Sequence, residues 1–275
     1  MTIAQALQHA QALGLTRLDA QVLLLHVMGQ DSHARAWLLT HDQTPLSQAQ
    51  QLAFAKAIER RLQQEPVAYI TGVKEFFGLP LQIDARVLDP RADTETLVDW
   101  ALSLLPDDAP ARVLDLGTGS GAIALAVQHA RAQAQVWAVD AHEDALTVAR
   151  ANAQRLNLPV HFLHSHWLRN VTGPFDLVLS NPPYIAEHDP HLPALLHEPM
   201  HALVAGADGL KDIRDIVSSA PAHLRDGGWL LIEHGHDQAM AVCDLLRQAG
   251  FGAVQSRSDL AGIARCSGGQ FKAVE

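Results

Sequence analysis

Cysteine is nearly absent from this chain of 275 residues, which holds only Cys243 and Cys266. Two cysteines cannot form a framework of several disulfides or a zinc centre built from cysteine, so the small disulfide-rich class is excluded. The sequence also lacks an apolar run of the roughly 18 residues that a membrane-spanning helix needs. Its N-terminal residues, Met1-Thr2-Ile3-Ala4-Gln5, lack the basic start of a secretory signal. We therefore expect a cytoplasmic protein that does not bind membranes.

Positive charge is also scarce. Charged residues make up 18% of the chain, and the formal net charge is −10. A broad basic surface is what grips a nucleic-acid backbone, so we expect no direct nucleic-acid substrate. Hydrophobic residues reach 48%, which is ordinary for a globular protein. With this length, we expect one catalytic core and a smaller appended domain.

The hydrophobic pattern divides the chain into three segments. Residues 1–65 repeat apolar side chains at helical spacing, which predicts an all-helical domain of three to five helices that recognises the substrate. Residues 66–90 are rich in strand-forming residues broken by Gly72 and Gly78, which predicts a β-hairpin linker. Residues 91–275 alternate strand and helix patterns and are the predicted catalytic domain.

The alternation in the third segment predicts the fold class. Its first helix is expected to have Asp93 or Thr94 as N-cap. Strands are expected at 112–116, 136–140, 160–163, 175–180 and 229–233, with two more within 251–265. Helices are expected at 122–131, 143–157, 210–224 and 237–249. This order predicts an α/β fold with a mainly parallel sheet and helices on both faces.

A glycine-rich turn follows the first of these strands. It consists of Gly117, Thr118, Gly119, Ser120 and Gly121. Glycines let a backbone turn sharply and approach a ligand, and the amides of the following helix start face that ligand. Together with Ala122, the glycines also fit the loose dinucleotide pattern, so they alone leave an oxidoreductase open.

Two carboxylates favour another ligand. Asp115 precedes the turn, where its carboxylate would pair with an ammonium group and repel a pyrophosphate. Asp140 ends the next strand, where a carboxylate accepts hydrogen bonds from ribose hydroxyls. S-adenosylmethionine carries both an ammonium group and a ribose, and we expect it to be the cofactor.

The most specific motif is Asn181-Pro182-Pro183-Tyr184, which follows the strand expected at 175–180. Prolines often end strands, but this does not explain the flanking Asn and Tyr. The Asn181 side chain and the Pro182 backbone offer two carbonyl acceptors for a planar –NH2 group, held rigidly by the prolines. Tyr184 would lie flat on that group. We expect these four residues to be catalytic through positioning, without a dedicated base.

With these motifs in place, the chain resembles the release factor glutamine methyltransferases, the HemK family. The matching segments are 65–72, 89–95, the glycine turn, 181–184, Glu198-Pro199 with Ala202-Leu203, and 208–210. The resemblance implies a class I S-adenosylmethionine-dependent methyltransferase fold, Rossmann-like, with a small helical N-terminal domain. It also implies methylation of the glutamine amide in the Gly-Gly-Gln loop of class 1 peptide chain release factors.

The resemblance also implies roles for particular residues. Cofactor contacts carry over to residues 117–121, Asp140, Trp167 and Asn181, and substrate contacts to residues 181–184. Two positions depart from the family pattern. Ala92 stands where proline is usual, and His166 stands where an acidic residue would accept from the adenine amino group.

Other functions remain open at this point. An adenine-amino methyltransferase acting on DNA or RNA would use the same motif at 181–184, although the acidic charge disfavours it. A non-catalytic S-adenosylmethionine-binding module is disfavoured because the motif is intact. We expect no metal, since the histidines at 161–166 and 188–201 lack a known ligand spacing, and we expect a monomer.

Three further segments carry weaker predictions. Lys56, Arg60 and Arg61 are interpreted as a solvated helix face. Residues 185–209 are predicted to be a mobile lid. The sequence Gly268-Gly269-Gln270 repeats the tripeptide that the family recognises, and we attribute the coincidence to chance.

Overall fold

The computed structural model describes residues 1–273 and divides the chain into two compact units. The first, Met1–Val73, is called the helical unit below, and the second, which starts at Lys74, is called the sheet unit. The division falls at the start of a short β-hairpin. Each unit has its own hydrophobic core.

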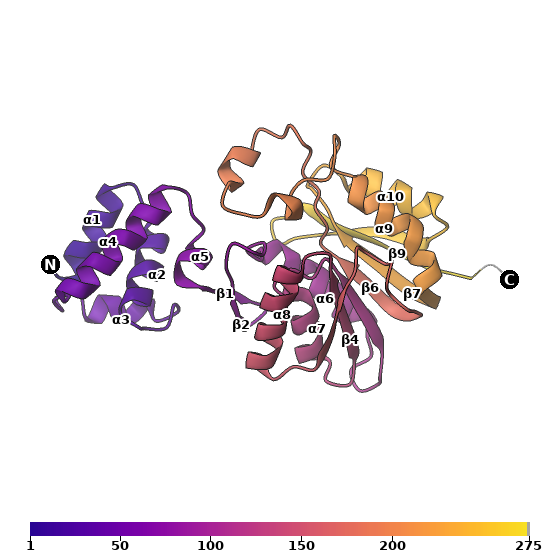
Figure 1. The fold of residues 1–275 in the computed structure, drawn as a ribbon, viewed down its shortest axis with the longest axis horizontal. Coiled ribbons are helices and arrows are strands. Elements are labelled where there is room, and N and C mark those ends of the chain that lie inside the picture. Colours follow the sequence, from indigo (N-terminus) through magenta and orange to yellow (C-terminus); the bar gives the residue numbers. More distant parts are fainter. Residues whose placement is uncertain (274–275) are drawn as a thin grey trace. The chain divides into compact units, whose positions relative to one another are not determined.

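The helical unit consists of five helices, in agreement with the predicted helical domain (Figure 1). They are α1 (Ile3–Ala12), α2 (Arg17–Val27), α3 (Arg35–Thr40), α4 (Gln48–Leu62) and α5 (Val67–Thr71). Thr2 and Ser47 begin α1 and α4 with capping boxes, which satisfy backbone amides that a helix start leaves free. Ile3, Leu24 and Phe54 are almost completely buried in its core.

The expected hairpin linker is shorter than predicted. Residues 67–71 form α5, so the expectation of a strand there was wrong. Pro66 precedes the helix and Gly72 ends it with φ at 74°. Ala68, Tyr69 and Ile70 are buried, because a single helical turn hides these β-prone side chains as well as a strand would. The hairpin itself comprises β1 (Val73–Phe76) and β2 (Leu79–Gln82).

The sheet unit is built on seven strands in the order β5-β4-β3-β6-β7-β9-β8 (Figure 1). The strands are β3 (Arg112–Leu116), β4 (Gln135–Asp140), β5 (Val160–His164), β6 (Phe175–Ser180), β7 (Leu224–Glu233), β8 (Gly252–Ser258) and β9 (Ala264–Gln270). Neighbours from β5 to β7 pair in parallel, whereas β9 is antiparallel to β7 and β8. The predicted α/β class and mainly parallel sheet are confirmed.

Helices cover both faces of this sheet. On one face lie α6 (Glu95–Leu104), α7 (Ala122–Ala130) and α8 (Glu143–Leu156), and on the other α9 (Lys211–Ser219) and α10 (Ala239–Gln248) (Figure 1). Short 3-10 turns occupy Ala92–Thr94, Leu192–Leu195, Met200–Ala202 and Ala220–His223. The last of these replaces the end of the helix expected at 210–224, because Pro221 interrupts α-helical hydrogen bonding. Among the described residues, no helix has the length and hydrophobicity to cross a membrane.

The tripeptide Gly268-Gly269-Gln270 lies inside the sheet as part of β9. A β-carbon at Gly268 would lie 2.4 Å from Leu231 Cδ2 and 2.7 Å from the Leu230 carbonyl oxygen. Both glycines are buried. Close packing between neighbouring strands therefore accounts for them.

Candidate functional site

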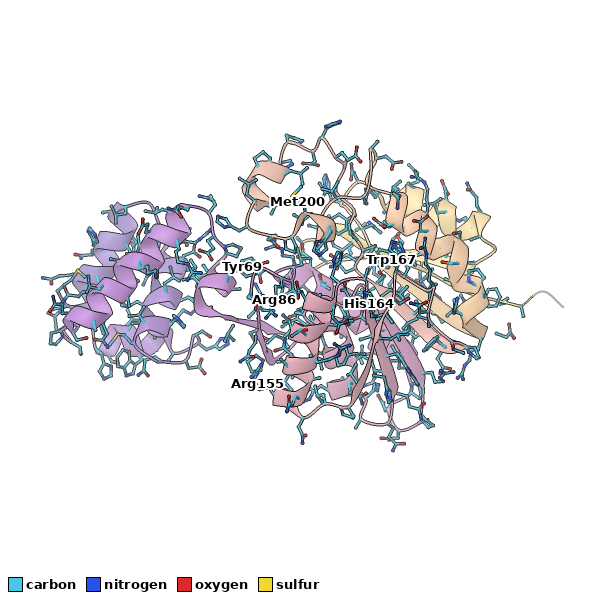
Figure 2. The ribbon with its side chains drawn as sticks, viewed as in Figure 1. Tyr69, Arg86, Arg155, His164, Trp167 and Met200 are labelled. Carbon is cyan, nitrogen blue, oxygen red and sulfur yellow. The ribbon has the colours of Figure 1, made fainter. Side chains whose placement is uncertain are left out.

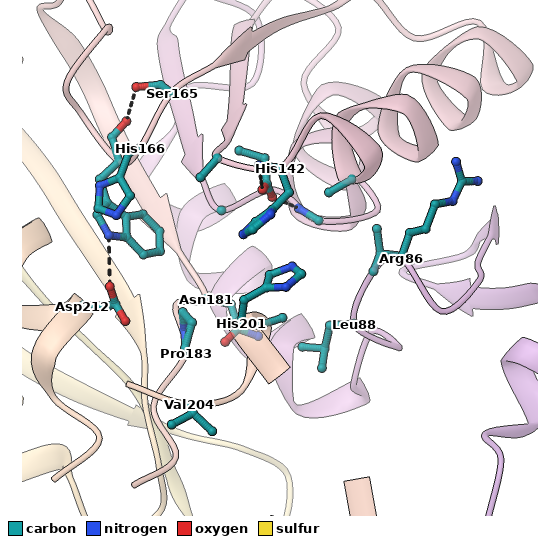
Figure 3. Close-up of a pocket in the computed structure, with 18 residues that line it drawn as sticks. Arg86, Leu88, His142, Ser165, His166, Asn181, Pro183, His201, Val204 and Asp212 are labelled. Carbon is teal, nitrogen blue, oxygen red and sulfur yellow. Dashed lines mark hydrogen bonds between the residues drawn. The ribbon is translucent and has the colours of Figure 1, made fainter. Parts of the chain in front are cut away.

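The carboxyl ends of β3, β4, β5 and β6 surround a cavity of about 300 Å³ (Figure 3). Ligand sites in open α/β sheets lie at this end of the strands, and small-molecule cavities begin near this size. Six of the predicted site residues line it: Gly117, Gly119, Asp140, Trp167, Asn181 and Pro183. Segments far apart in the sequence thus meet at one place.

Asp140 ties the glycine turn to the end of β4. Its Oδ2 accepts from the Gly119 amide at 2.9 Å, and its Oδ1 accepts from the His142 amide at 2.9 Å. Each carboxylate oxygen has a second lone pair, so Asp140 can still accept from a ligand in the cavity. The predicted contact with ribose hydroxyls is compatible with this arrangement and stays a prediction.

Trp167 forms the wall opposite the glycine turn. A β-carbon at Gly117, whose φ is 70°, would lie 3.1 Å from the Trp167 ring, so glycine is needed for this close approach. The indole Nε1 donates to Asp212 Oδ1 at 3.2 Å, and Ser165 Oγ donates to the Trp167 carbonyl at 2.8 Å (Figure 3). These bonds fix the ring plane. His166, the residue that departs from the family pattern, also lines the cavity.

Asp115 lies beneath the glycine turn and is not in the cavity wall. Its Oδ2 accepts from Thr118 Oγ1 at 2.6 Å and from the Ala124 amide at 3.2 Å. Its Oδ1 is buried and has no hydrogen-bond partner among residues 1–273. Complete burial raises the pKa of Asp115 to about 7, and the nearby charge of Asp140 adds to the rise. The predicted pairing with an ammonium group remains a prediction, and Oδ1 is the free acceptor for it.

The other predicted residues of the glycine turn hold the shape of the turn and do not face the cavity. Thr118, Ser120 and Gly121 do not line the cavity. Thr118 and Ser120 are buried, and the Gly121 backbone begins α7. The loop therefore presents two of its glycines to the cavity and uses the remaining residues to hold its shape.

A second cavity of about 340 Å³ adjoins the first at Asn181. Its lining includes Leu88, Arg91, Tyr184 and Ala202. Asn181 lines both cavities, together with Leu88 and Ala202, so groups bound in the two cavities would lie on either side of these shared residues. This is the arrangement needed to transfer a small group between two ligands.

The corner at residues 181–184 presents two carbonyl groups. Asn181 Nδ2 donates to Thr94 Oγ1 at 3.2 Å, which leaves Asn181 Oδ1 free to accept from a ligand. The carbonyl of Pro182 accepts no hydrogen bond from any residue in 1–273. Thr94 precedes α6, as predicted, but its side chain makes no capping bond there. The hydroxyl is directed to Asn181 instead, a partner 87 positions away.

Tyr184 is held at both its ring and its backbone. Its hydroxyl donates to Glu233 Oε1 at 3.5 Å, and burial together with that carboxylate raises the pKa of Tyr184. Its carbonyl oxygen accepts from Gln238 Nε2 at 3.0 Å. A β-carbon at Gly209 would lie 2.2 Å from the same carbonyl oxygen, so only glycine fits there. These contacts determine where the Tyr184 ring lies in the second cavity.

The predicted lid, residues 185–209, has a fixed stem. Ile185 pairs with Leu203 and Ala205 through backbone hydrogen bonds of 2.9 Å. Glu198 is buried, forms an ion pair with Arg91 and accepts from the Asp89 amide at 3.3 Å. Burial raises the pKa of Glu198, and Arg91 opposes the rise. The mobility of this segment stays a prediction.

Several lining residues were not predicted from sequence. They include Arg86, Leu88, His142, His201, Ala202 and Asp212. The rings of His142 and His201 stack with centroids 3.6 Å apart, and Figure 3 shows the two rings next to each other in the cavity lining. Figure 2 shows Arg86, Trp167 and Met200, from three separate segments, around the same end of the sheet. Ala202 stands in a segment that matches the family and His201 in a histidine cluster, but no local signal placed them, or the other four residues, in this site.

Two weaker predictions concern charge and metal. In the helical unit, Arg60 pairs with Glu65 and Arg61 pairs with Asp19. The basic strip is thus partly neutralised within its own unit, and Lys56 is exposed. Within residues 1–273, no three His, Cys, Asp or Glu side chains are grouped so as to hold a metal ion.

Comparison with known proteins identifies relatives over nearly the whole chain. The Methyltransferase small domain family matches residues 94–256, and the PrmC N-terminal domain family matches residues 2–72. The Release factor glutamine methyltransferase of Bordetella pertussis is 48% identical over 260 residues, which cover 93% of this chain and 95% of that protein. The protein of the same name from Burkholderia pseudomallei is 46% identical over 277 residues, covering 97% and 96%.

A solved structure shares the fold of the sheet unit. It is a 16S rRNA methyltransferase of T. thermophilus in complex with AdoMet and guanosine. The TM-score is 0.54 at 20% sequence identity, and the match covers 73% of this chain and 50% of that one. At this identity, the likeness concerns the fold alone.

Proposed function

The chain belongs to the release factor glutamine methyltransferase family, and from this premise we propose the reaction that it catalyses. It transfers a methyl group from S-adenosylmethionine to the side-chain amide nitrogen of the glutamine in the Gly-Gly-Gln motif of peptide chain release factors. The observation that carries the proposal is the position of Asn181, which lines both cavities and has its side-chain oxygen free.

The first cavity fits S-adenosylmethionine. Asp140 lines it and has lone pairs for ribose hydroxyls, and the Trp167 ring packs against the glycine turn. Asp115 lies beneath the turn, outside the cavity wall, and its Oδ1 has no partner within residues 1–273, so it is the proposed acceptor for the ammonium group. His166 lines the part of the wall where the family pattern has an acidic residue. When bound, this cofactor supplies a methyl group on a positively charged sulfur, which a nitrogen lone pair can attack.

The second cavity suits the glutamine side chain. The free carbonyl oxygen of Asn181 accepts one amide N–H group, and the Tyr184 ring packs against the amide plane. The proposed acceptor of the second N–H group is the carbonyl of Pro182, which has no partner within residues 1–273 and is next in the chain, although Pro182 itself lines neither cavity. With both N–H groups held, the nitrogen lone pair points along the remaining direction. A carbon–nitrogen bond forms as the carbon–sulfur bond breaks, the bonding electrons stay on sulfur, and the nitrogen releases one proton to water. The residues act by position and pre-set dipoles.

The helical unit is the proposed substrate-recognition domain. Its residues match the PrmC N-terminal domain family, and every residue that lines the two cavities belongs to the sheet unit. The helical unit is therefore free to bind parts of the release factor beyond the glutamine loop. Since one chain supplies all the lining residues, we also propose that the monomer is active, in the cytoplasm where peptide release occurs, without a nucleic-acid substrate.

Mass spectrometry of the reaction products tests this proposal. The purified chain is mixed with S-adenosylmethionine and an unmethylated class 1 release factor, and in parallel with DNA and RNA that contain adenine. We expect one added methyl group on the glutamine of Gly-Gly-Gln and none on the nucleic acids. Methyl groups on adenine alone would assign the chain to the nucleic-acid methyltransferases instead.

The variant Asn181→Ala tests the role of the free carbonyl. Loss of one pre-set hydrogen bond at a reacting group lowers kcat by about 100- to 1,000-fold. We expect a loss of this order, while calorimetry should show that the variant still binds S-adenosylmethionine. An unchanged kcat would exclude Asn181 from the reaction.

A further inference from the structure

Glu233 is a buried carboxyl group that the scheme above does not use. It ends β7, is 2% exposed, and lies directly behind the corner at residues 181–184. Its Oε1 is 3.5 Å from the Tyr184 hydroxyl, and its Oε2 has no hydrogen-bond partner by distance and angle within residues 1–273. A buried carboxyl group is costly, so its place behind the reacting corner calls for a reason.

The hydrogen bond from Asn181 to Thr94 suggests why a carboxyl group lies behind the reacting corner. Asn181 Nδ2 donates to Thr94 Oγ1, and a hydroxyl that accepts one bond still has its own proton to donate. Thr94 is 4% exposed, so water does not take that proton. The adjacent acceptor is Glu233: burial raises the pKa of this carboxyl group, and the donors Thr94 and Asn181 both oppose that rise. An ionised carboxylate only accepts hydrogen bonds, which gives the chain of donors a single direction.

We propose that Glu233 is a positioning residue that fixes which way the Asn181 amide faces. An ionised Glu233 attracts both the Asn181 –NH2, which already donates to Thr94, and the Thr94 hydroxyl proton, so that Asn181 Oδ1 faces the substrate. If the group at position 233 can itself donate, the hydrogen bonds can reverse their direction. Asn181 then turns its –NH2 toward the substrate –NH2. Two donors then oppose each other and the substrate amide is not held. This inference rests on the function proposed above.

The groups around Glu233 set the pH at which it ionises, so the orientation of the Asn181 amide should depend on pH. Burial, with a smaller contribution from Asp93, raises its pKa to about 7, although Thr94, Arg265 and Asn181 oppose the rise. Tyr184 and the Cys266 thiol also face it, and both stay neutral because their own pKa values are raised. Glu233 is thus ionised above about pH 7 and protonated below it. We expect kcat to rise with pH through about 7.

The experiment measures kcat from about pH 5.5 to 9 with S-adenosylmethionine and release factor both saturating. Saturating cofactor separates Glu233 from Asp115, whose titration affects cofactor binding. The variants are Glu233→Gln, Thr94→Val and Thr94→Ser, with Asp244→Asn as a carboxyl-to-amide control on the exposed surface of α10. Calorimetry gives the affinity of each variant for S-adenosylmethionine.

We expect Glu233→Gln to lower kcat about 100-fold, the scale of one misplaced pre-set contact. It should also lose the rise of kcat near pH 7. Its affinity for S-adenosylmethionine should stay within about twofold of the parent, a small change because a tenfold change corresponds to about 1.4 kcal/mol. Thr94→Val should behave in the same way, Thr94→Ser should restore kcat, and Asp244→Asn should match the parent.

Two results would overturn the inference. One is a Glu233→Gln variant with the kcat and pH profile of the parent. The other is a variant whose cofactor affinity falls together with kcat, which would show a merely structural role. If Glu233→Gln does not fold, the Thr94→Val and Thr94→Ser pair decides, since equal kcat values in both would contradict the hydrogen-bond chain. Failure of the proposed function itself is distinct, because the parent would then not methylate release factor at all.

Discussion

Replacing Asp115 by Asn should stabilise the ligand-free protein at alkaline pH and weaken its binding of S-adenosylmethionine. The carboxyl group is completely buried, and its Oδ1 has no partner among residues 1–273. Ionising it without a counter-charge is unfavourable, so its pKa rises from 3.8 to about 7. The side chain thus opposes folding at high pH, and under the proposed function the ammonium group of the cofactor would be the charge that compensates it.

The pKa shift sets the size of the effect. Because the folded pKa is raised, the contribution of Asp115 to stability is fully present below 3.8 and is lost as pH rises toward 7. Between about pH 5.5 and 8 the free energy of unfolding should fall by ~2 kcal/mol on account of this group. Asn does not titrate. Its –NH2 lacks an acceptor at the Oδ1 position, which costs about 1–3 kcal/mol at every pH.

Urea unfolding of the parent and of Asp115→Asn at about pH 5.5 and 8 measures the free energy of unfolding of each protein. Tryptophan fluorescence reports mainly the sheet unit, because Trp37 is the sole tryptophan of the helical unit. The stability of the variant relative to the parent should rise by ~2 kcal/mol from about pH 5.5 to 8, and titrations elsewhere cancel in this difference. Affinity for S-adenosylmethionine should fall about tenfold or more, since charged hydrogen bonds contribute about 1.5–3 kcal/mol. A pH-independent stability difference with unchanged affinity would refute the argument.

Two more predictions concern the segment after the catalytic corner. Gly209→Ala should lower kcat about 100-fold, because its methyl group would occupy space 2.2 Å from the Tyr184 carbonyl oxygen and displace that residue; Gly206→Ala, which meets only the Lys211 side chain, is the control for the positive φ alone. Limited proteolysis within residues 185–209 should slow when cofactor and release factor bind together, and equal rates with and without them would exclude a closing lid.

The architecture of the sheet unit was predictable because its signals are local. Buried strands, the glycine turn and the corner at residues 181–184 each stand in one short stretch, and topology rules then place their ends together. Residues 67–71 show where local signals fail. Val67, Tyr69 and Ile70 suit a strand, but packing in the helical unit and the Gly72 backbone select a helix.

The parts of the site that escaped prediction depend on contacts between distant positions. Asp93 or Thr94 was expected as the N-cap of the first helix; Thr94 has that position, but its hydroxyl binds Asn181 and caps no helix amide. Asp115 was expected to face the ligand, and it lies under the turn with one oxygen engaged by Thr118. The type and position of each residue were read from sequence, whereas the partner that decides its role is set by tertiary packing.

The tripeptide within β9 has a consequence for the search for substrates. Gly268-Gly269-Gln270 carries the sequence of the proposed target, yet its two glycines lie in β9 between β7 and β8. Leu231 and Trp100 cover Gly268, whereas Phe251 and Val254 cover Gly269. A glutamine in that setting cannot enter a cavity of about 340 Å³ without opening the sheet. Counting Gly-Gly-Gln in a proteome would therefore overestimate the targets of such an enzyme, and only copies on unpaired, accessible loops qualify.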